Sequence, residues 1–233
     1  KEVADVYEVI FLKEREPEYQ AYLLTGGAIV SKVRGKGNVD FYGEYIQAIK
    51  ERIGGRWAAG VQTTALKKED CKRLKEYGVD FHHANIEVWD KDMFKVICPG
   101  KEKEVGRDEW IKRVIESVDV FGVGNVCPTF VTGSELAQPY TKFKDVDEAV
   151  DSLAEGLDYI MSYGVTPRLS SWTVEPGSAL EGHPPISLDY YVKVDRAWYQ
   201  LWRKHHLPPI RGMGPMGPGR AVSPNSAHLD VGN

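Results

Sequence analysis

The chain has 233 residues, 42% of them hydrophobic, and its 30 lysines and arginines against 34 aspartates and glutamates give a net charge of −4. This apolar fraction excludes a wholly disordered chain, and the charge provides no general attraction to nucleic acid or to an anionic membrane. No stretch approaches the roughly 20 apolar residues of a membrane-spanning helix. Three scattered cysteines are too few for a disulfide framework, so we expect a reducing, cytoplasmic location.

Apolar stretches typical of strands alternate with helical stretches along most of the chain. In chain order we expect a helix over Lys1–Leu12, a strand over Tyr19–Thr25, a helix over Phe41–Ile53, a strand over Trp57–Thr63, a helix over Lys67–Tyr77, a strand over Val79–Trp89, a helix over Asp108–Val120, a strand over Val123–Thr132, a helix over Asp145–Tyr163, a strand over Val165–Val174 and a helix over Ser187–His205. Strands separated by helices, with little sign of hairpins, favour a parallel sheet. The predicted fold class is therefore α/β, a parallel (β/α) partial TIM barrel of about six strands that can be incomplete at both ends. A doubly wound open sheet is the alternative.

The last segment differs from the rest in composition. Residues 207–233 contain ten prolines or glycines in 27 residues, which excludes a helix or a central strand. We therefore divide the chain into a barrel core, residues 1–206, and a Pro/Gly-rich C-terminal segment, residues 207–233. An ordered cover over the domain is slightly favoured for this segment over a flexible linker. Because the chain starts at Lys1 without a methionine, we expect it to begin inside a longer protein.

Ligands of parallel α/β folds gather at the carboxyl ends of the strands, and four such ends carry notable residues. At the first, Gly26 and Gly27 would let the backbone approach a ligand closely, although an ordinary turn explains the same pair. At the second, strand alternation places His83, Asn85 and Glu87 on one face. Three polar side chains on a buried strand need partners or a cavity, whereas a solvent-exposed edge strand would need neither.

The third and fourth strand ends add polar side chains to the same interior. If alternation holds, Cys127, Thr129, Ser171 and Thr173 face the cavity that His83 faces, so these five residues are the candidates for substrate binding. The chain has no P-loop, GxGxxG, GxSxG, CxxC or HExxH motif, which disfavours phosphate-loop, hydrolase-elbow and zinc sites.

One cysteine has a lysine nearby in the sequence. Cys98 lies three residues before Lys101, and a neighbouring cation would lower the pKa of that thiol.

Taken in this order, the strand ends over Tyr19–Leu180 resemble the core of the radical S-adenosylmethionine (SAM) superfamily. The nearest group is the biotin synthase-like one, which also holds the hydrogenase maturase HydE and methylornithine synthase. Thr25–Gly27 resembles the glycine motif whose backbone holds the amino group of SAM. Asn85–Glu87 resembles an Asn-x-Asp segment whose acid takes the ribose hydroxyls, with Glu87 in place of the aspartate.

The resemblance implies further contacts with SAM. A basic residue on the helix near residues 107–118 would take the SAM carboxylate; Lys112 and Arg113 both fit, and Arg113 is preferred for its bidentate fork. Gly133 with Glu135 resembles the Gly-x-Gly-Glu turn of the family, and residues 172–180 resemble the segment that receives the adenine. The predicted SAM-binding residues are Thr25, Gly26, Gly27, Asn85, Glu87, Arg113, Val174 and Glu175.

The CxxxCxxC loop that holds the [4Fe–4S] cluster of the family does not occur in this sequence. We expect those ligands upstream of Lys1, so no metal ligand is expected in this chain. A copy of the sulfur-donating [2Fe–2S] cluster of biotin synthase is not expected either, because Gly60 stands where one of its cysteines would lie.

The resemblance also implies an activity. Beside a reduced cluster, SAM would be cleaved to a 5′-deoxyadenosyl radical that abstracts hydrogen from a small-molecule substrate, in the biosynthesis of a cofactor. The expected partner is a reducing protein such as ferredoxin or flavodoxin, and neither nucleic acid nor a membrane is expected as a partner. Two other classes stay open: a cluster-free barrel that binds SAM or a related ligand, and a hydrolytic or aldolase-like barrel that uses His83 and Glu87 as acid and base.

Overall fold

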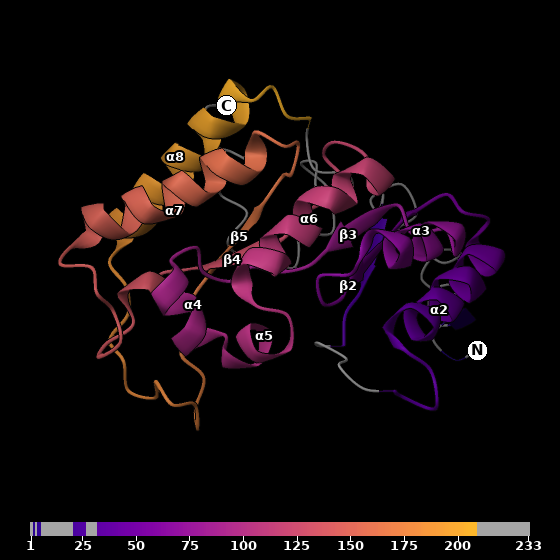
Figure 1. Ribbon diagram of the computed structural model, residues 1–233, viewed down its shortest axis with the longest axis horizontal. Coiled ribbons are helices and arrows are strands. Elements are labelled where there is room, and N and C mark those ends of the chain that lie inside the picture. The colour runs from indigo at the N-terminus through magenta and orange to yellow at the C-terminus, as the bar shows by residue number, and fades with distance from the viewer. Residues whose placement is uncertain (1, 3, 6–20, 27–31, 209–233) are drawn as a thin grey trace.

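The computed structural model describes residues 2, 4–5, 21–26 and 32–208, in which strands and helices alternate (Figure 1). The elements are β1 Ala21–Leu24, α2 Asn38–Ile53, β2 Ala58–Gln62, α3 Lys68–Glu76, β3 Phe81–His83, α4 Lys91–Ile97, α5 Pro99–Glu104, α6 Arg107–Phe121, β4 Thr129–Thr132, the 3-10 helix η2 Ser134–Leu136, α7 Val146–Met161, β5 Arg168–Ser171 and α8 Leu188–Lys204. Most of the helix expected over Lys1–Leu12, the candidate Gly27 and residues 209–233 lie outside the described residues.

The strands are parallel and lie side by side in chain order. Strands β1, β2 and β3 form one sheet, and β4 and β5 form a second. Two parallel bridges, His82 with Val126 and Glu87 with Phe130, connect the two sheets. A strand order that never reverses is expected of a partial barrel, whereas a doubly wound sheet reverses at its switch point. The described residues hold five strands in open sheets rather than a barrel of about six.

The later strands are shorter than the apolar pattern predicts. The expected strand over Val79–Trp89 is regular only at Phe81–His83, and Glu87 beyond it has a φ of 71°. Pro128 and Pro167 directly precede β4 and β5. Because proline has no N–H to donate, each breaks the ladder of hydrogen bonds at that point.

Helices α2, α3, α6 and α7 follow one another across the molecule and cover one face of the strands (Figure 1). Helix α7 shows why the sequence forms them: the side chain of Asp145 caps it by accepting a hydrogen bond from the backbone N–H of Glu148 at 3.0 Å. The apolar stripe expected on this helix is confirmed, with buried Ala149, Leu153, Leu157 and Ile160 and half-buried Val146 and Val150.

The opposite face of the sheet, here called the inner face, carries Ala21, Leu23, Ala58, Gly60, Phe81 and His83. The strand register places these side chains next to one another, because paired residues of parallel strands point to the same side. Gly60 leaves room for the ring of Phe81, since a Cβ on Gly60 would lie 2.2 Å from that ring. The missing side chain on β2 therefore leaves space that the aromatic ring fills.

The two last helices, α7 and α8, pack against each other (Figure 1). The indole of buried Trp198 on α8 donates a hydrogen bond to the carbonyl of Pro167 at 2.8 Å, which ties this helix to the start of β5. No helix in the described part of the chain is long and apolar enough to cross a membrane.

Candidate functional site

The end of β1 presents exposed backbone next to a buried hydroxyl. Thr25 and Gly26 follow β1 and are exposed. A Cβ on Gly26 would lie 2.7 Å from the phenol oxygen of Tyr42, an oxygen that is buried without a hydrogen-bond partner. Only glycine fits here without displacing that ring.

The segment after β3 is a central part of the sheet, so the edge-strand alternative is wrong. The side-chain oxygen of Asn85 accepts a hydrogen bond from the backbone N–H of Thr129 at 3.1 Å. The backbone N–H groups of Ile86 and Glu87 both donate to the carbonyl of Thr129, at 3.1 and 3.0 Å. The backbone of Glu87 adopts the left-handed conformation, which is unfavourable for residues other than glycine and costs about 1 kcal/mol or more. These backbone bonds compensate for that cost and aim the carboxylate.

A lysine that sequence reasoning missed holds this carboxylate. The ammonium of Lys101 on α5 lies 2.6 Å from Oε1 of Glu87 and donates to the carbonyl of Asn85 at 2.7 Å. It also lies 4.8 Å from the centroid of the Trp110 ring on α6, a cation–π distance. The side chains of Lys101 and Glu87 are 19% and 21% exposed, so water screens this pair only partly. The sequence contains Lys101, but the short helix α5 that carries it was not predicted, so its position beside Glu87 could not be inferred.

The two basic candidates on α6 lie in different surroundings. The side chain of Lys112 is 63% exposed and faces the acids of its own helix. The side chain of Arg113 is 18% exposed, pairs with Glu109 at 2.8 Å, and donates to the carbonyl of Ala65 at 3.2 Å. Because Ala65 follows β2, Arg113 is the candidate that lies against a strand end.

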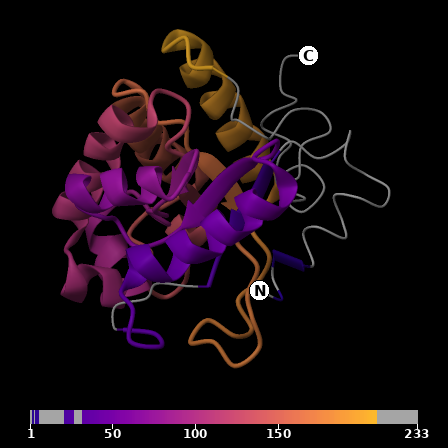
Figure 2. The same cartoon turned by 90° about the vertical axis from the view of Figure 1, so that its right-hand side faces the viewer.

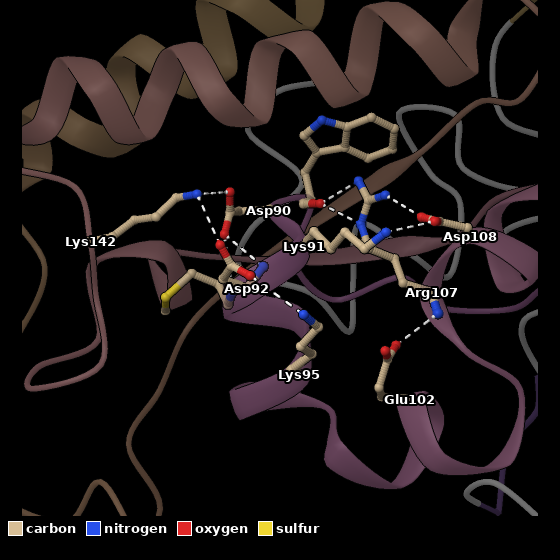
Figure 3. Close-up of polar contacts among 10 residues, drawn as sticks. Asp90, Lys91, Asp92, Lys95, Glu102, Arg107, Asp108 and Lys142 are labelled. Carbon is tan, nitrogen blue, oxygen red and sulfur yellow. Dashed lines mark hydrogen bonds and ion pairs between the residues drawn. The ribbon is translucent and has the colours of Figure 1, made fainter.

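A polar network connects α4 to the start of α6 through the ion pair of Lys91 with Asp108 (Figure 3). The guanidinium of Arg107 donates to the carbonyl of Trp89 at 2.8 Å and lies over its ring. The backbone N–H of Arg107 donates to Glu102 at 2.9 Å, and the side chain of Asp90 caps α4. The network ties α4, α5 and the start of α6, which carry Lys101 and Arg113, to the segment that follows β3.

The turn after β4 buries an acid. Glu135 is fully buried, and its Oε2 accepts hydrogen bonds from the backbone N–H of Gly133 at 2.9 Å and from the hydroxyl of Tyr190 at 2.8 Å. Its Oε1 has no partner. Burial raises the pKa of Glu135 to about 7, although both hydrogen bonds oppose the shift. The acid links the turn to α8.

The segment after β5 forms a long loop before α8 (Figure 2). Thr173 and Glu175 are exposed, and Val174 is half-buried. Trp172 and Leu180 anchor this segment by packing on a small apolar cluster at the strand ends, which comprises Val88, Met93, Phe94, Cys98 and Ala137. The predicted adenine segment therefore adjoins the ends of β3 and β4 through this cluster.

The inner face carries three of the five substrate candidates, His83, Cys127 and Thr129. The bridge of His82 with Val126 places Cys127 beside His83, and Thr129 lies in register with Arg168. Ser171 is in register with Thr132 instead, so it points to the face opposite Thr129. The expectation that Ser171 shares the interior with Thr129 is wrong, because alternation within one strand does not determine its register against the next.

The thiols are less acidic than expected. Cys98 is buried, and burial raises its pKa to about 12 even though the Lys101 cation lowers it. The expectation that Lys101 lowers the pKa of this thiol below its ordinary value is therefore wrong. Burial also raises the pKa of Cys127 to about 12. Both are neutral thiols near pH 7.

The donor sets decide which groups the described residues can hold. They include no cluster of three or more histidines, cysteines or acids that could bind a metal ion. The same residues do suit SAM: the half-buried carboxylate of Glu87, the half-buried guanidinium of Arg113 and the exposed backbone at Gly26 lie near the ends of neighbouring strands. A ribose, a carboxylate and an amino group need hydrogen-bond partners of these three kinds.

Comparison with known proteins places this arrangement in context. No protein-family model matches the chain. Over 137 residues, 59% of this chain, the sequence is 26% identical to bacteriochlorophyllide c C-7(1)-hydroxylase of Chlorobaculum limnaeum, and the match covers 31% of that protein.

Two solved structures share the fold. HydG, a maturase of the [FeFe]-hydrogenase, aligns over 86% of this chain with a TM-score of 0.58 and 15% identity. HydG from Carboxydothermus hydrogenoformans aligns over 87%, with a TM-score of 0.58 and 16% identity. The chain spans about a third of the curated relative and 40% and 43% of the solved chains. The likenesses to HydG show a shared fold, and they give no support to the biotin synthase-like group expected from the sequence.

Proposed function

We propose that this chain is the SAM-binding core of a radical SAM enzyme that acts in the maturation of a cofactor. The observation that carries the proposal is the Glu87 carboxylate, which is held by Lys101 at 2.6 Å at the end of a central parallel strand. The HydG-like fold and the similarity to a hydroxylase support the same class. Bound beside a reduced [4Fe–4S] cluster, SAM would supply a radical that abstracts hydrogen from the substrate.

The carboxylate of Glu87 has one oxygen available to accept a hydrogen bond from a ribose hydroxyl. Lys101 bonds to Oε1 of Glu87, and Oε2 has no partner among the described residues. Oε2 can therefore accept a hydrogen bond from a ribose hydroxyl while Oε1 keeps its bond to Lys101.

The other predicted contacts follow from the same strand ends. The exposed backbone of Thr25 and Gly26 would accept hydrogen bonds from the amino group of SAM, and the guanidinium of Arg113 would take its carboxylate. Arg113 would exchange its bond to Glu109 for the ligand, and the exposed carboxylate of Glu109 would then be solvated by water. Val174 and Glu175 would meet the adenine. The cluster ligands would come from outside the described residues.

Binding of SAM tests this assignment. In the full-length protein, reconstituted with iron and sulfide without oxygen, Glu87→Ala should weaken SAM binding at least about tenfold, roughly 1.4 kcal/mol. Glu155→Ala, which removes an exposed acid from α7, is the matched control and should leave the affinity unchanged. Calorimetry measures both. An unchanged affinity of the Glu87 variant would exclude the carboxylate from the site.

Iron analysis separates the enzyme from a cluster-free binding barrel. A radical SAM enzyme should contain about four irons and four sulfides per chain and cleave SAM to 5′-deoxyadenosine when reduced by dithionite or by ferredoxin or flavodoxin. Tight SAM binding without iron would instead assign a cluster-free ligand-binding protein. The reaction class, transferase or lyase, would then be read from the fate of the substrate.

A further inference from the structure

Arg168 places an uncompensated cation on the inner face of the sheet. It is the first residue of β5 and lies in register with Thr129 of β4. The side chain is half-buried, and its guanidinium makes no hydrogen bond or ion pair with the part of the chain that the structure describes. Burial lowers the pKa of Arg168, although the group stays charged. Burying the charge of an arginine without a neighbouring acid costs free energy, so we expect a ligand to supply the compensating negative charge.

Two buried side chains beside Arg168 lack partners as well. Both ring nitrogens of His83 and the hydroxyl of Thr166 are fully buried without a hydrogen bond. The backbone N–H of Thr166 donates to Val126 at 2.9 Å, which sets Thr166 level with Cys127, and Cys127 lies beside His83. Arg168 is one step further along β5 on the same side. His83, Thr166 and Arg168 therefore form one inner-face cluster, and all their unused donors are on one side of the sheet.

The chemistry of this cluster selects its ligand. Burial, followed by the Arg168 and His82 neighbours, lowers the pKa of His83 well below its ordinary value, so the imidazole is neutral and offers one N–H donor. The cluster thus has a single positive charge in a fork geometry together with neutral donors. A carboxylate carries one negative charge and matches that fork, whereas a phosphate dianion would leave one charge unbalanced in a buried place.

We propose that Arg168 binds a carboxylate of the small-molecule substrate, with His83 and Thr166 completing its hydrogen bonds. This inference rests on the proposed function only in taking the inner face as the place where the substrate lies. It adds Arg168, which the sequence motifs did not single out, as a residue that determines specificity.

A pair of isosteric probes tests the charge. Benzoate and benzamide differ in charge and not in shape, so their binding to the full-length protein, without SAM or iron, can be compared by NMR titration. Benzoate should bind at least tenfold more tightly than benzamide, and this preference should disappear in Arg168→Met. Arg168→Lys should keep part of it, because the charge remains and the fork is lost. Arg196→Met, which removes an exposed arginine from α8, should keep all of it.

A second readout distinguishes ligand binding from a structural role. Without ligand, Arg168→Met should melt at the same temperature as the unchanged protein or higher, because it removes an unpaired charge. Any of four results would overturn the inference. Two concern the probes: benzoate and benzamide bind equally, or the preference for benzoate persists in Arg168→Met. The other two are tighter binding of inorganic phosphate than of benzoate, and a lower melting temperature of Arg168→Met. These binding measurements need no iron–sulfur cluster. A negative result would therefore refute the carboxylate site without refuting SAM cleavage, and an absence of SAM cleavage would not affect the test of the carboxylate site.

Discussion

The buried acid Glu135 makes a prediction about stability and pH. Its pKa is raised to about 7 in the folded protein, against 4.5 for an ordinary glutamate. Below pH 4.5 the acid is protonated in both states and contributes no pH dependence. Between pH 4.5 and 7 the unfolded chain releases the proton and the folded chain retains it, so the free energy of unfolding falls by about 1.4 kcal/mol per pH unit, or about 3 kcal/mol in all. Above pH 7 both states are ionised and the loss is complete.

Glu135→Gln isolates this contribution, because glutamine cannot ionise and keeps the oxygen that accepts from Gly133 and Tyr190. Urea unfolding from pH 4.5 to 8 should give a variant about as stable as the unchanged protein at pH 4.5 and about 3 kcal/mol more stable at pH 7.5. His82 and His83, whose pKa values burial lowers, give the opposite slope, which cancels in the difference between the two proteins. A difference that does not change with pH would refute the reasoning. Tyr190→Phe removes a hydrogen bond that lowers the pKa of Glu135, so in that background the loss of stability should continue to a higher pH and be larger in total.

Two further predictions concern packing. Gly156→Ala on α7 should destabilise the protein by about 1–3 kcal/mol in urea unfolding, because its Cβ would lie 2.4 Å from the Trp89 ring, and overpacking of this kind outweighs the helix preference of alanine. Equal or greater stability would show that the ring moves freely. All three thiols, Cys71, Cys98 and Cys127, are buried with a pKa raised to about 12, so Ellman's reagent at pH 8 should label them slowly in the folded protein and fully in urea. Rapid labelling of one thiol in the folded state would identify a site that opens.

Local patterns in the sequence determined the kinds of element and their order. The apolar stripe of α7 and the strand β2 appear where periodicity predicts them, because periodicity reports which face of a single element is buried. The parallel α/β class followed from the alternation of such elements. The helices α4 and α5 were missed, since α4 is only seven residues and α5 six, too short for a stripe to show.

Only the tertiary structure decided which side chains meet. Lys101 lies 14 residues from its partner Glu87 in the chain, and Tyr190 lies 55 residues from Glu135. The register of β5 against β4 put Arg168 on the inner face and turned Ser171 away from it. Burial decided that the thiol of Cys98 is not activated by its neighbouring lysine. A pattern along one element indicates which of its faces is buried. The register between two strands and the burial of a single loop side chain such as Cys98 depend on contacts between distant segments, so such a pattern does not determine them.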